Sequence, residues 1–571
     1  MNRREFFASA FSAERVALES AGDEKNGVRA DDLKRAGLDG AMMRVQSARP
    51  RPTSGIAQFT GRWNAQTARH LARRAMFGAT EAQIAQLAGM TITQAVDLIL
   101  QDVPLPEPPL DITTGQTWHN KPFVDGATDA RYYNYLRAWW IGLMVNQPPS
   151  VWEKMTLFWH NHFVSDRATV GDSRYLYQQN ALFRRSALGN FRTLCRDITI
   201  DPTMLRYLNG NTNIAARPNQ NYARELLELF TIGKGAERAQ GDYTNYTEQD
   251  VQQAARVLTG WSVRANQTTA YANGYHFESF FNANNHDTGN KTFSAAFQNT
   301  VITGRTGASA GMDELNDLLN MIFRQAETAR FIVRKLYRWF VYYVIDQTVE
   351  RNVIEPLAEI FRRNDYNIKP VLRALFLSQH FYDAENRGAM IKSPADFIVA
   401  LHKQFFPNNP TDQTQLIPAM NRYIGWFAAL QMSLFQHPTV AGWEAYYQEP
   451  SYYQLWLSTA TLPVRNSYSD QIINTTTLDR ISIIRSLTTP SDPYAMVDQL
   501  AERYFSMSLT TAQREDLVTT VLMGGSPYYE WTEQWNDFTR NQNDMTKRRA
   551  VDTRISNLLR FMLRMGEYQL T

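Results

Sequence analysis

The sequence predicts an all-α fold, a multi-helix core with one small inserted β-hairpin, and two observations support this prediction. Apolar residues recur at helical spacing through most of the chain after residue 56, as in the stretch 64–77. Alternation with a period of two is rare, and its clearest examples are the aromatic stretch 275–281 and the short run 300–303. A turn-rich segment separates these two stretches, so we expect them to form a hairpin between helices.

The predicted helices follow one another with short connections. After 64–77 and a second helix opened by Thr80, the helical pattern recurs at 91–101, 130–146, 151–163, 180–198, 220–232, 247–260, 312–325, 327–345, 350–363, 368–378 and 393–406. It resumes beyond the turn dipeptide Asn409-Pro410 at 416–435, 493–505, 510–522 and 545–567. We therefore expect a flexible segment over 1–55, a helical core with the candidate site over 56–410, and a C-terminal helical region over 411–571 packed on that core.

Composition excludes several classes of protein. The 59 Lys and Arg residues nearly balance the 56 Asp and Glu residues, so the net charge of +3 is too small for the basic field that nucleic-acid binding needs. The single cysteine, Cys195, excludes an internal disulfide and zinc sites built from paired cysteines. No apolar run approaches the ~20 residues of a membrane span. We expect no nucleic-acid partner and no membrane span.

The N-terminus is compatible with two locations. Arg3-Arg4 followed by Phe6-Phe7 is similar to a twin-arginine export signal, but Glu14, Arg15 and further charged residues interrupt the apolar segment that must follow. We therefore expect a cytoplasmic protein, with export through this degenerate signal as the alternative.

Histidines provide the first candidate ligands. His160 and His162 lie two positions apart, and imidazole is a favoured ligand for Zn, Fe and Cu. On a regular helix their side chains point about 200° apart, so both face one site only if the helix ends near them. The alternative is a pair of partly buried histidines bonded to backbone carbonyls.

A pair of acids provides the second candidate. Glu225 and Glu228 fall on one face of the predicted helix 220–232, opposite an apolar face. Carboxylates three residues apart can bind one cation or divide the roles of general acid and base. The alternative is a solvated face with Arg224 as a charge partner.

The third candidate is the turn-rich segment 285–291. His286 and Asp287 form a compact nitrogen and oxygen ligand pair, and Lys291 offers a cation for an anionic substrate. Turn chemistry alone also explains Asp287. Nearby, the residues 307–311 match the nucleophile elbow of serine hydrolases, but we expect no α/β sheet around Ser309 and so no such enzyme.

Several of these segments resemble one family in matching order over roughly residues 60–470. The resemblance rests on residues 74–78, 158–163, 201–205, 221–231, 258–261, 286–289 with Lys291, 442–443 and 456–465. The chain is similar to the uncharacterised bacterial family called domain of unknown function 1800. That resemblance implies a predominantly helical protein, often exported, and no established activity. This chain departs from the family pattern at Gln220, where the pattern has an acid, and at His437, where it has proline.

Two functional hypotheses follow. The first is a metal-dependent enzyme, hydrolytic or oxidative, with a divalent Zn, Fe or Mn ion held by His160, His162, Glu225, Glu228, His286 and Asp287. In that hypothesis, Glu225, Glu228 and Lys291 are the catalytic residues. The alternative is a non-catalytic binding or assembly protein that uses an aromatic-rich C-terminal surface around Trp443 and Trp456. Either way the substrate or protein partner is unknown.

Overall fold

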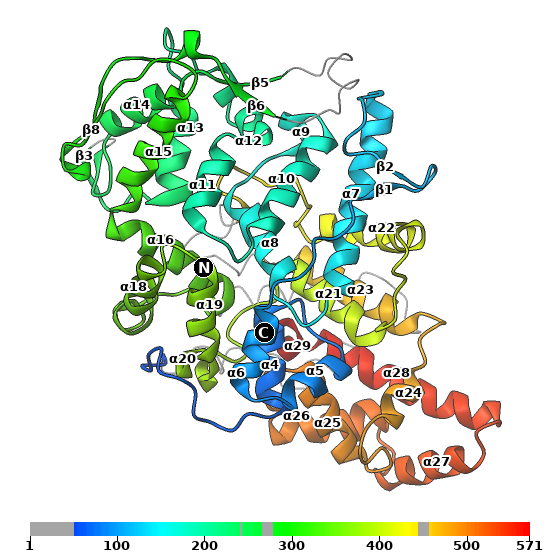
Figure 1. The fold of residues 1–571 in the computed structure, drawn as a ribbon. Helices are drawn as coiled ribbons and strands as arrows, with labels where there is room; N and C mark the ends of the chain where they lie inside the picture. The colour runs from blue at the N-terminus through cyan, green and yellow to red at the C-terminus, as the bar shows by residue number, and fades with distance from the viewer. Residues whose placement is uncertain (1–50, 240–241, 265–277, 444–455) are drawn as a thin grey trace.

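The computed structural model describes residues 51–239, 242–264, 278–443 and 456–571, and regular structure within these ranges is almost entirely helical (Figure 1). The strands form only two-stranded antiparallel sheets. The predicted all-α class is therefore confirmed. Residues 1–50 lie outside the described residues, and with them the export-signal prediction and most of the predicted flexible segment.

Polar caps define where the early helices begin. Asn64, Thr80 and Thr91 each accept backbone N–H bonds at the first turn and form capping boxes. The helices of this part are α4 (Ala65–Ala75), α5 (Glu81–Ala88), α6 (Ile92–Ile99), α7 (Gly126–Asn146), α8 (Trp152–His162), α9 (Arg167–Val170), α10 (Ser173–Arg185), α11 (Phe191–Thr199) and α12 (Pro202–Tyr207).

The middle of the chain adds helices in which short π-helical segments interrupt or extend the α-helix. They are α13 (Gln220–Glu225) with the π-segment η2 (Leu226–Thr231), α14 (Glu248–Val257), α15 (Ala310–Phe323), α16 (Ala326–Phe340), α17 (Gln347–Val349), the π-segment η6 (Glu350–Ile354), α18 (Glu355–Arg363), α19 (Ile368–Leu377), α20 (Gln379–Tyr382) and α21 (Pro394–Phe405). Short 3₁₀ turns are η1 (Gly210–Thr212), η4 (Ala283–Asn285), η5 (Ala295–Phe297) and η7 (Ala384–Asn386).

The last part of the chain is helical as well. Its elements are α22 (Gln413–Ala429), α23 (Thr461–Asn474), α24 (Arg480–Arg485), α25 (Pro493–Tyr504), α26 (Thr511–Asp516) with the π-segment η10 (Leu517–Leu522), α27 (Tyr529–Arg540), α28 (Met545–Arg564) and α29 (Gly566–Gln569). The end of the chain contacts the middle part, because the backbones of Thr571 and Met390 exchange two hydrogen bonds beside α4 (Figure 1).

Within the described ranges, four small antiparallel sheets connect helices. They pair β1 (Leu110–Asp111) with β2 (Gln116–Thr117), β3 (Glu237–Ala239) with β4 (Asp242–Tyr243), β5 (Trp261–Val263) with β6 (Ser279–Phe281), and β7 (Lys291–Thr292) with β8 (Val301–Ile302).

The two strand candidates from the sequence belong to different sheets. Residues 279–281 pair with 261–263, whereas 301–302 pair with 291–292. The reason for the second pairing is local. Between β7 and β8, Gln298 and Asn299 adopt positive φ angles of 60° and 55°, which reverse the chain so that β8 runs back along β7. Residues 275–277 lie outside the described residues.

Two large hydrophobic cores hold the helices of the described residues together, and α8 lies between them. One core draws on residues 59–100, 151–261 and 293–389, and the other combines residues from α7 and α10 with residues 395–568. All eleven residues of α8 are buried, including its charged and polar ones. Polar side chains on α8 therefore need partners inside the protein.

The membrane prediction concerns helix length and hydropathy. In the described ranges, no helix combines the length and the apolar character that crossing a bilayer requires.

Candidate functional site

His160 and His162 lie in the last turn of α8 and point toward different surroundings. His162 Nε2 is 3.0 Å from the Phe230 carbonyl, and its Nδ1 is 3.1 Å from Lys335 Nζ. His160 Nε2 accepts a hydrogen bond from the Phe435 N–H at 3.1 Å, so its proton resides on Nδ1. Burial lowers the pKa of both imidazoles well below the usual value, so both are neutral at pH 7.

Glu225 and Glu228 lie on the same side of the helix, as the sequence predicts, at the point where α13 becomes the π-segment η2. Glu228 accepts a hydrogen bond from the Tyr246 hydroxyl at 3.0 Å and pairs with Lys234 at 2.7 Å. Burial, and then the charge of Glu228, raise the pKa of Glu225 to about 7. Glu225 thus exchanges its proton near neutral pH, as a general acid or base must.

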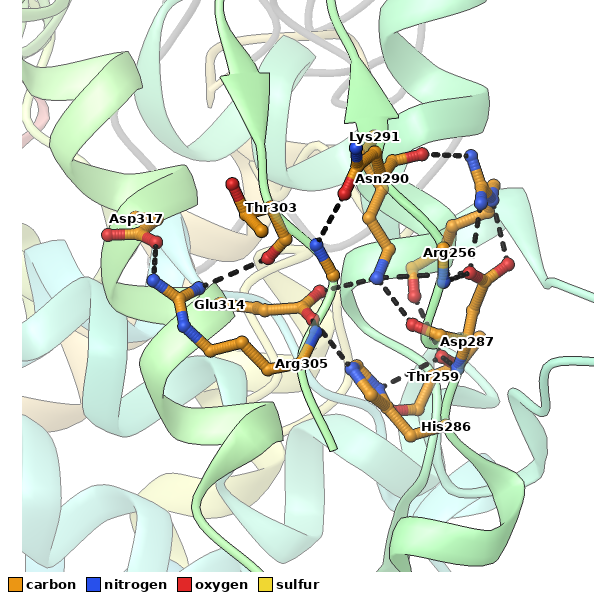
Figure 2. Close-up of polar contacts among 12 residues, drawn as sticks. Arg256, Thr259, His286, Asp287, Asn290, Lys291, Thr303, Arg305, Glu314 and Asp317 are labelled. Carbon is orange, nitrogen blue, oxygen red and sulfur yellow. Dashed lines mark hydrogen bonds and ion pairs between the residues drawn. The ribbon is translucent and has the colours of Figure 1, made fainter. Parts of the chain in front are cut away.

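His286, Asp287 and Lys291 meet in a network centred on Glu314 of α15 (Figure 2). Glu314 Oε1 lies 3.1 Å from His286 Nε2, and its Oε2 lies 2.6 Å from Lys291 Nζ. Burial alone would raise the pKa of Glu314, but the hydrogen bonds that it accepts, these two and one from the Arg305 N–H, outweigh burial and lower it.

Further contacts engage the Asp287 carboxylate, the Nδ1 atom of His286 and the amine of Lys291. Asp287 accepts two bonds from Arg256, at 2.7 and 2.9 Å, and His286 Nδ1 lies 2.9 Å from the Thr259 carbonyl (Figure 2). Lys291 Nζ also donates to the Asp287 carbonyl. These contacts join the loop 285–291 to α14 and α15, and they engage the side chains that the sequence suggested as ligands.

The six suggested ligands therefore belong to separate networks. Over the described ranges, no group of three or more His, Cys, Asp or Glu side chains is arranged to hold a metal ion. The Zn, Fe or Mn centre and its catalytic residues Glu225, Glu228 and Lys291 stay a prediction that no contact here supports. Ser309 directly precedes α15, but β8 ends seven residues earlier, so the strand-turn-helix context of a nucleophile elbow is missing.

A different place in the fold has the features of a binding site. A partly enclosed cavity, here called the central cavity, has an internal volume of about 100 Å³. Its charged lining residues are four cations and one acid: Arg73, Arg74, Lys154, Arg338 and Asp396. Its aromatic lining residues are Trp339, Tyr343, Trp443 and Trp456. Asn161 and Ser393 are polar residues of the same lining.

Three helices position several of these side chains. Lys154 and Asn161 project from α8 two turns apart, Arg338 and Trp339 lie in the last turn of α16, and Asp396 lies in the first turn of α21. This arrangement places the cavity where both hydrophobic cores meet α8.

Asn161 attaches the segment that carries Trp443. Its side-chain oxygen accepts the Trp443 N–H at 2.8 Å. Gly442 has a φ of +82°, and a Cβ atom there would lie 2.4 Å from that same oxygen. Only glycine fits this approach without strain. The segments 158–163 and 442–443, both part of the family resemblance, therefore meet at the wall of the cavity.

Lys154 is the buried cation on the floor of the cavity. Its side chain is 5% exposed and forms an ion pair with Asp396, which also accepts a 2.8 Å hydrogen bond from Ser393 Oγ. The amine lies 4.8 Å from the Phe77 ring centre and 5.5 Å from that of Trp339. Burial lowers the pKa of Lys154, and Asp396 only partly offsets this effect.

Arg73 and Arg74 face helix ends. Arg74 donates to the carbonyls of Phe340 and Val341 at the end of α16. Arg73 donates to the carbonyls of Arg503 and Phe505 at the end of α25. Cations at helix C-termini are favourable, so both arginines join elements and also bring positive charge to the cavity.

More positive charge lies close by. Buried Lys392 has its amine 3.6 Å from the Tyr568 ring centre, and its backbone carbonyl accepts a bond from Arg465. Burial, then the charges of Arg73 and Arg465, lower the pKa of Lys392 well below the usual value. The lining of the cavity itself contains four cationic side chains and one acidic side chain.

Family comparison agrees with the sequence motifs. The family model described as "Protein of unknown function (DUF1800)" matches residues 70–570. The chain belongs to this family. No curated protein and no solved structure matches it. The family model covers every lining residue of the central cavity except Thr571.

The sequence signals for this cavity were incomplete. Trp443 and Trp456 stood out as part of an aromatic-rich segment, although residues 444–455 of that segment lie outside the described residues. Lys154, Arg338 and Asp396 lie on three separate helices, and nothing in their local spacing links them. The only sequence signal was that Lys154 lies in the first turn of the predicted helix that also contains His160 and His162.

Proposed function

We propose that this protein binds a small organic anion in the central cavity. The observation that carries this proposal is the lining itself, in which four cationic side chains and one carboxylate surround a partly enclosed, aromatic-walled space. The proposal specifies the binding alternative expected from the sequence, with a small ligand in place of a protein partner.

The charge distribution favours an anion over a neutral or cationic ligand. Arg465 donates to the carbonyl of Lys392, between the lining residues Ile391 and Ser393, and so adds a further cation close to the cavity. Cations held together away from water repel one another, and a bound anion relieves that repulsion while forming charge-assisted hydrogen bonds. A cation entering the same space would find Asp396 already paired with Lys154 and would meet four cationic side chains.

The aromatic walls favour a ligand with a flat or apolar body. Trp339, Trp443 and Trp456 line the cavity together with Met390 and Met432. Ring faces provide contact area at a low cost in side-chain entropy, and the cationic groups then orient the charged end. A carboxylate or phosphate on an aromatic or aliphatic body fits both features.

The test compares ligands that differ in charge alone. We expect benzoate to raise the melting temperature of the purified protein, and benzamide, which has the same shape without the charge, to leave it unchanged. Acetate, with the charge but without the ring, should bind more weakly than benzoate. Equal shifts with benzoate and benzamide would refute the proposal.

Two arginines of α16 supply a matched pair of variants. Arg338 lines the cavity, whereas Arg334, one turn earlier, pairs with Glu327 and Glu350 outside it. Arg338→Gln should weaken benzoate binding about tenfold, since a hydrogen bond to a charged group contributes about 1.5–3 kcal/mol. Arg334→Gln removes the same charge from the same helix and should leave the affinity unchanged. Equal loss in both variants would place the binding site elsewhere.

A further inference from the structure

We infer that Lys154 is a reactive amine that captures an aldehyde or ketone group of the bound anion as an imine. This inference rests on the proposed function, because the anionic group is what holds the carbonyl compound in the central cavity. It extends that function from binding to covalent chemistry and specifies the ligand class as small carbonyl acids, such as 2-oxo acids.

The geometry gives Lys154 the surroundings that this chemistry needs. Its amine opens into the central cavity, while two rings, Phe77 and Trp339, cover its other sides and keep water away. Burial lowers its pKa, which increases the fraction of neutral, nucleophilic amine. Arg338 lines the same cavity and can hold the carboxylate of the ligand.

Asp396 supplies the proton transfers of the reaction. In the free protein the ammonium of Lys154 is paired with this carboxylate, so the proton moves along an existing contact to free the nitrogen lone pair. Ser393 Oγ donates to the second carboxylate oxygen at 2.8 Å and fixes its orientation. Asp396 thus acts as base and later as acid in one place.

The chemical step balances without any further reactant. The neutral amine attacks the carbonyl carbon, a C–N bond forms, and the carbonyl oxygen takes up a proton. The carbinolamine then loses its hydroxyl as water, with a proton from Asp396, and leaves the C=N bond of the imine. One water is released for each imine formed, and no electrons are exchanged with an outside partner.

Two other buried lysines show why burial alone does not explain such reactivity. Lys392 is covered by the Tyr568 ring, and Lys403 is buried in α21; neither of them lines the central cavity. Burial lowers the pKa of Lys403 to about 7. Lys403 is therefore a matched control, a low-pKa amine without the cavity.

The experiment traps the imine on the full-length protein. Glyoxylate, a small carbonyl acid, is added with cyanoborohydride, which reduces an imine to a stable amine, and the modified lysine is identified by peptide mass spectrometry. Glycolate, which lacks the carbonyl, serves as the blank. We expect Lys154 to be modified at least about tenfold faster than Lys403, because binding holds the carbonyl beside Lys154 alone.

Substitutions separate covalent capture from binding. Lys154→Arg keeps the positive charge but has no nucleophilic amine, so it should lose the trapped adduct. Lys403→Met should keep both the adduct and the binding of benzoate. Adducts spread over surface lysines, or an adduct that persists in Lys154→Arg, would overturn this inference and leave anion binding intact. A wild-type protein that fails to bind benzoate refutes the proposed function itself.

Discussion

Lys403 is a buried lysine whose amine has no hydrogen-bond partner in the described part of the chain. It lies on α21 with only 3% of its surface exposed, close to residues of the second hydrophobic core. Burial lowers its pKa from 10.5 to about 7. Removing a charge from water without a partner is costly, so this side chain destabilises the folded state whenever it is protonated.

The size and the pH dependence of this cost follow from the two pKa values. Below pH 7 the amine is protonated in both states, and the full difference of about 3.5 pH units corresponds to a destabilisation of about 5 kcal/mol. Between pH 7 and 10.5 the unfolded chain binds more protons than the folded one, so stability rises with pH. Above pH 10.5 the penalty has disappeared.

The variant Lys403→Met keeps the length of the side chain and removes the amine. We expect it to unfold with a free energy about 5 kcal/mol higher than the wild type at pH 6, and about 2 kcal/mol higher at pH 9. Urea denaturation of both proteins at the two pH values measures this difference, and other titrating groups cancel. A difference that does not change with pH, or a less stable variant at pH 6, would refute the reasoning.

Three further predictions concern other buried groups. Glu314→Gln should cost about 3–5 kcal/mol in urea denaturation, because it leaves His286 and Lys291 without their carboxylate; an unchanged midpoint would contradict the network's role. Trp443→Ala should cost about 3–5 kcal/mol since the ring is 2% exposed, and retained stability would show that the ring does not support the core. Glu225→Gln should stabilise the protein more at pH 8 than at pH 5, because the folded pKa of about 7 makes stability fall as pH rises from 4.5 to 7. The same gain at both pH values would exclude that titration.

Much of the fold could be predicted because helices depend on local patterns. The period of apolar residues and the capping side chains Asn64, Thr80 and Thr91 lie within a few positions of the helices that they define. Strand partners could not be predicted in the same way, since residues 301–302 find their partner through a chain reversal at Gln298 and Asn299, whereas residues 279–281 pair with the earlier segment 261–263. Pairing depends on backbone conformation between strands, which short apolar runs do not specify.

The candidate residues show the same division. Spacing on one helix correctly placed Glu225 and Glu228 side by side, and it separated His160 from His162. Glu314, which organises His286 and Lys291, lies more than twenty residues away on another helix and had no sequence signal. A local pattern contains no information about which distant acid neutralises a buried base.

The sequence by itself determined the helical class, the family and the absence of a disulfide within this chain, because each depends on residue types and short-range spacing. Only the tertiary structure brought Lys154, Arg338 and Asp396 from three helices to one cavity, and only it covered their charges with aromatic rings. The physical reason is that the reactivity of a charged group depends on what replaces water around it, and packing between distant segments decides that replacement.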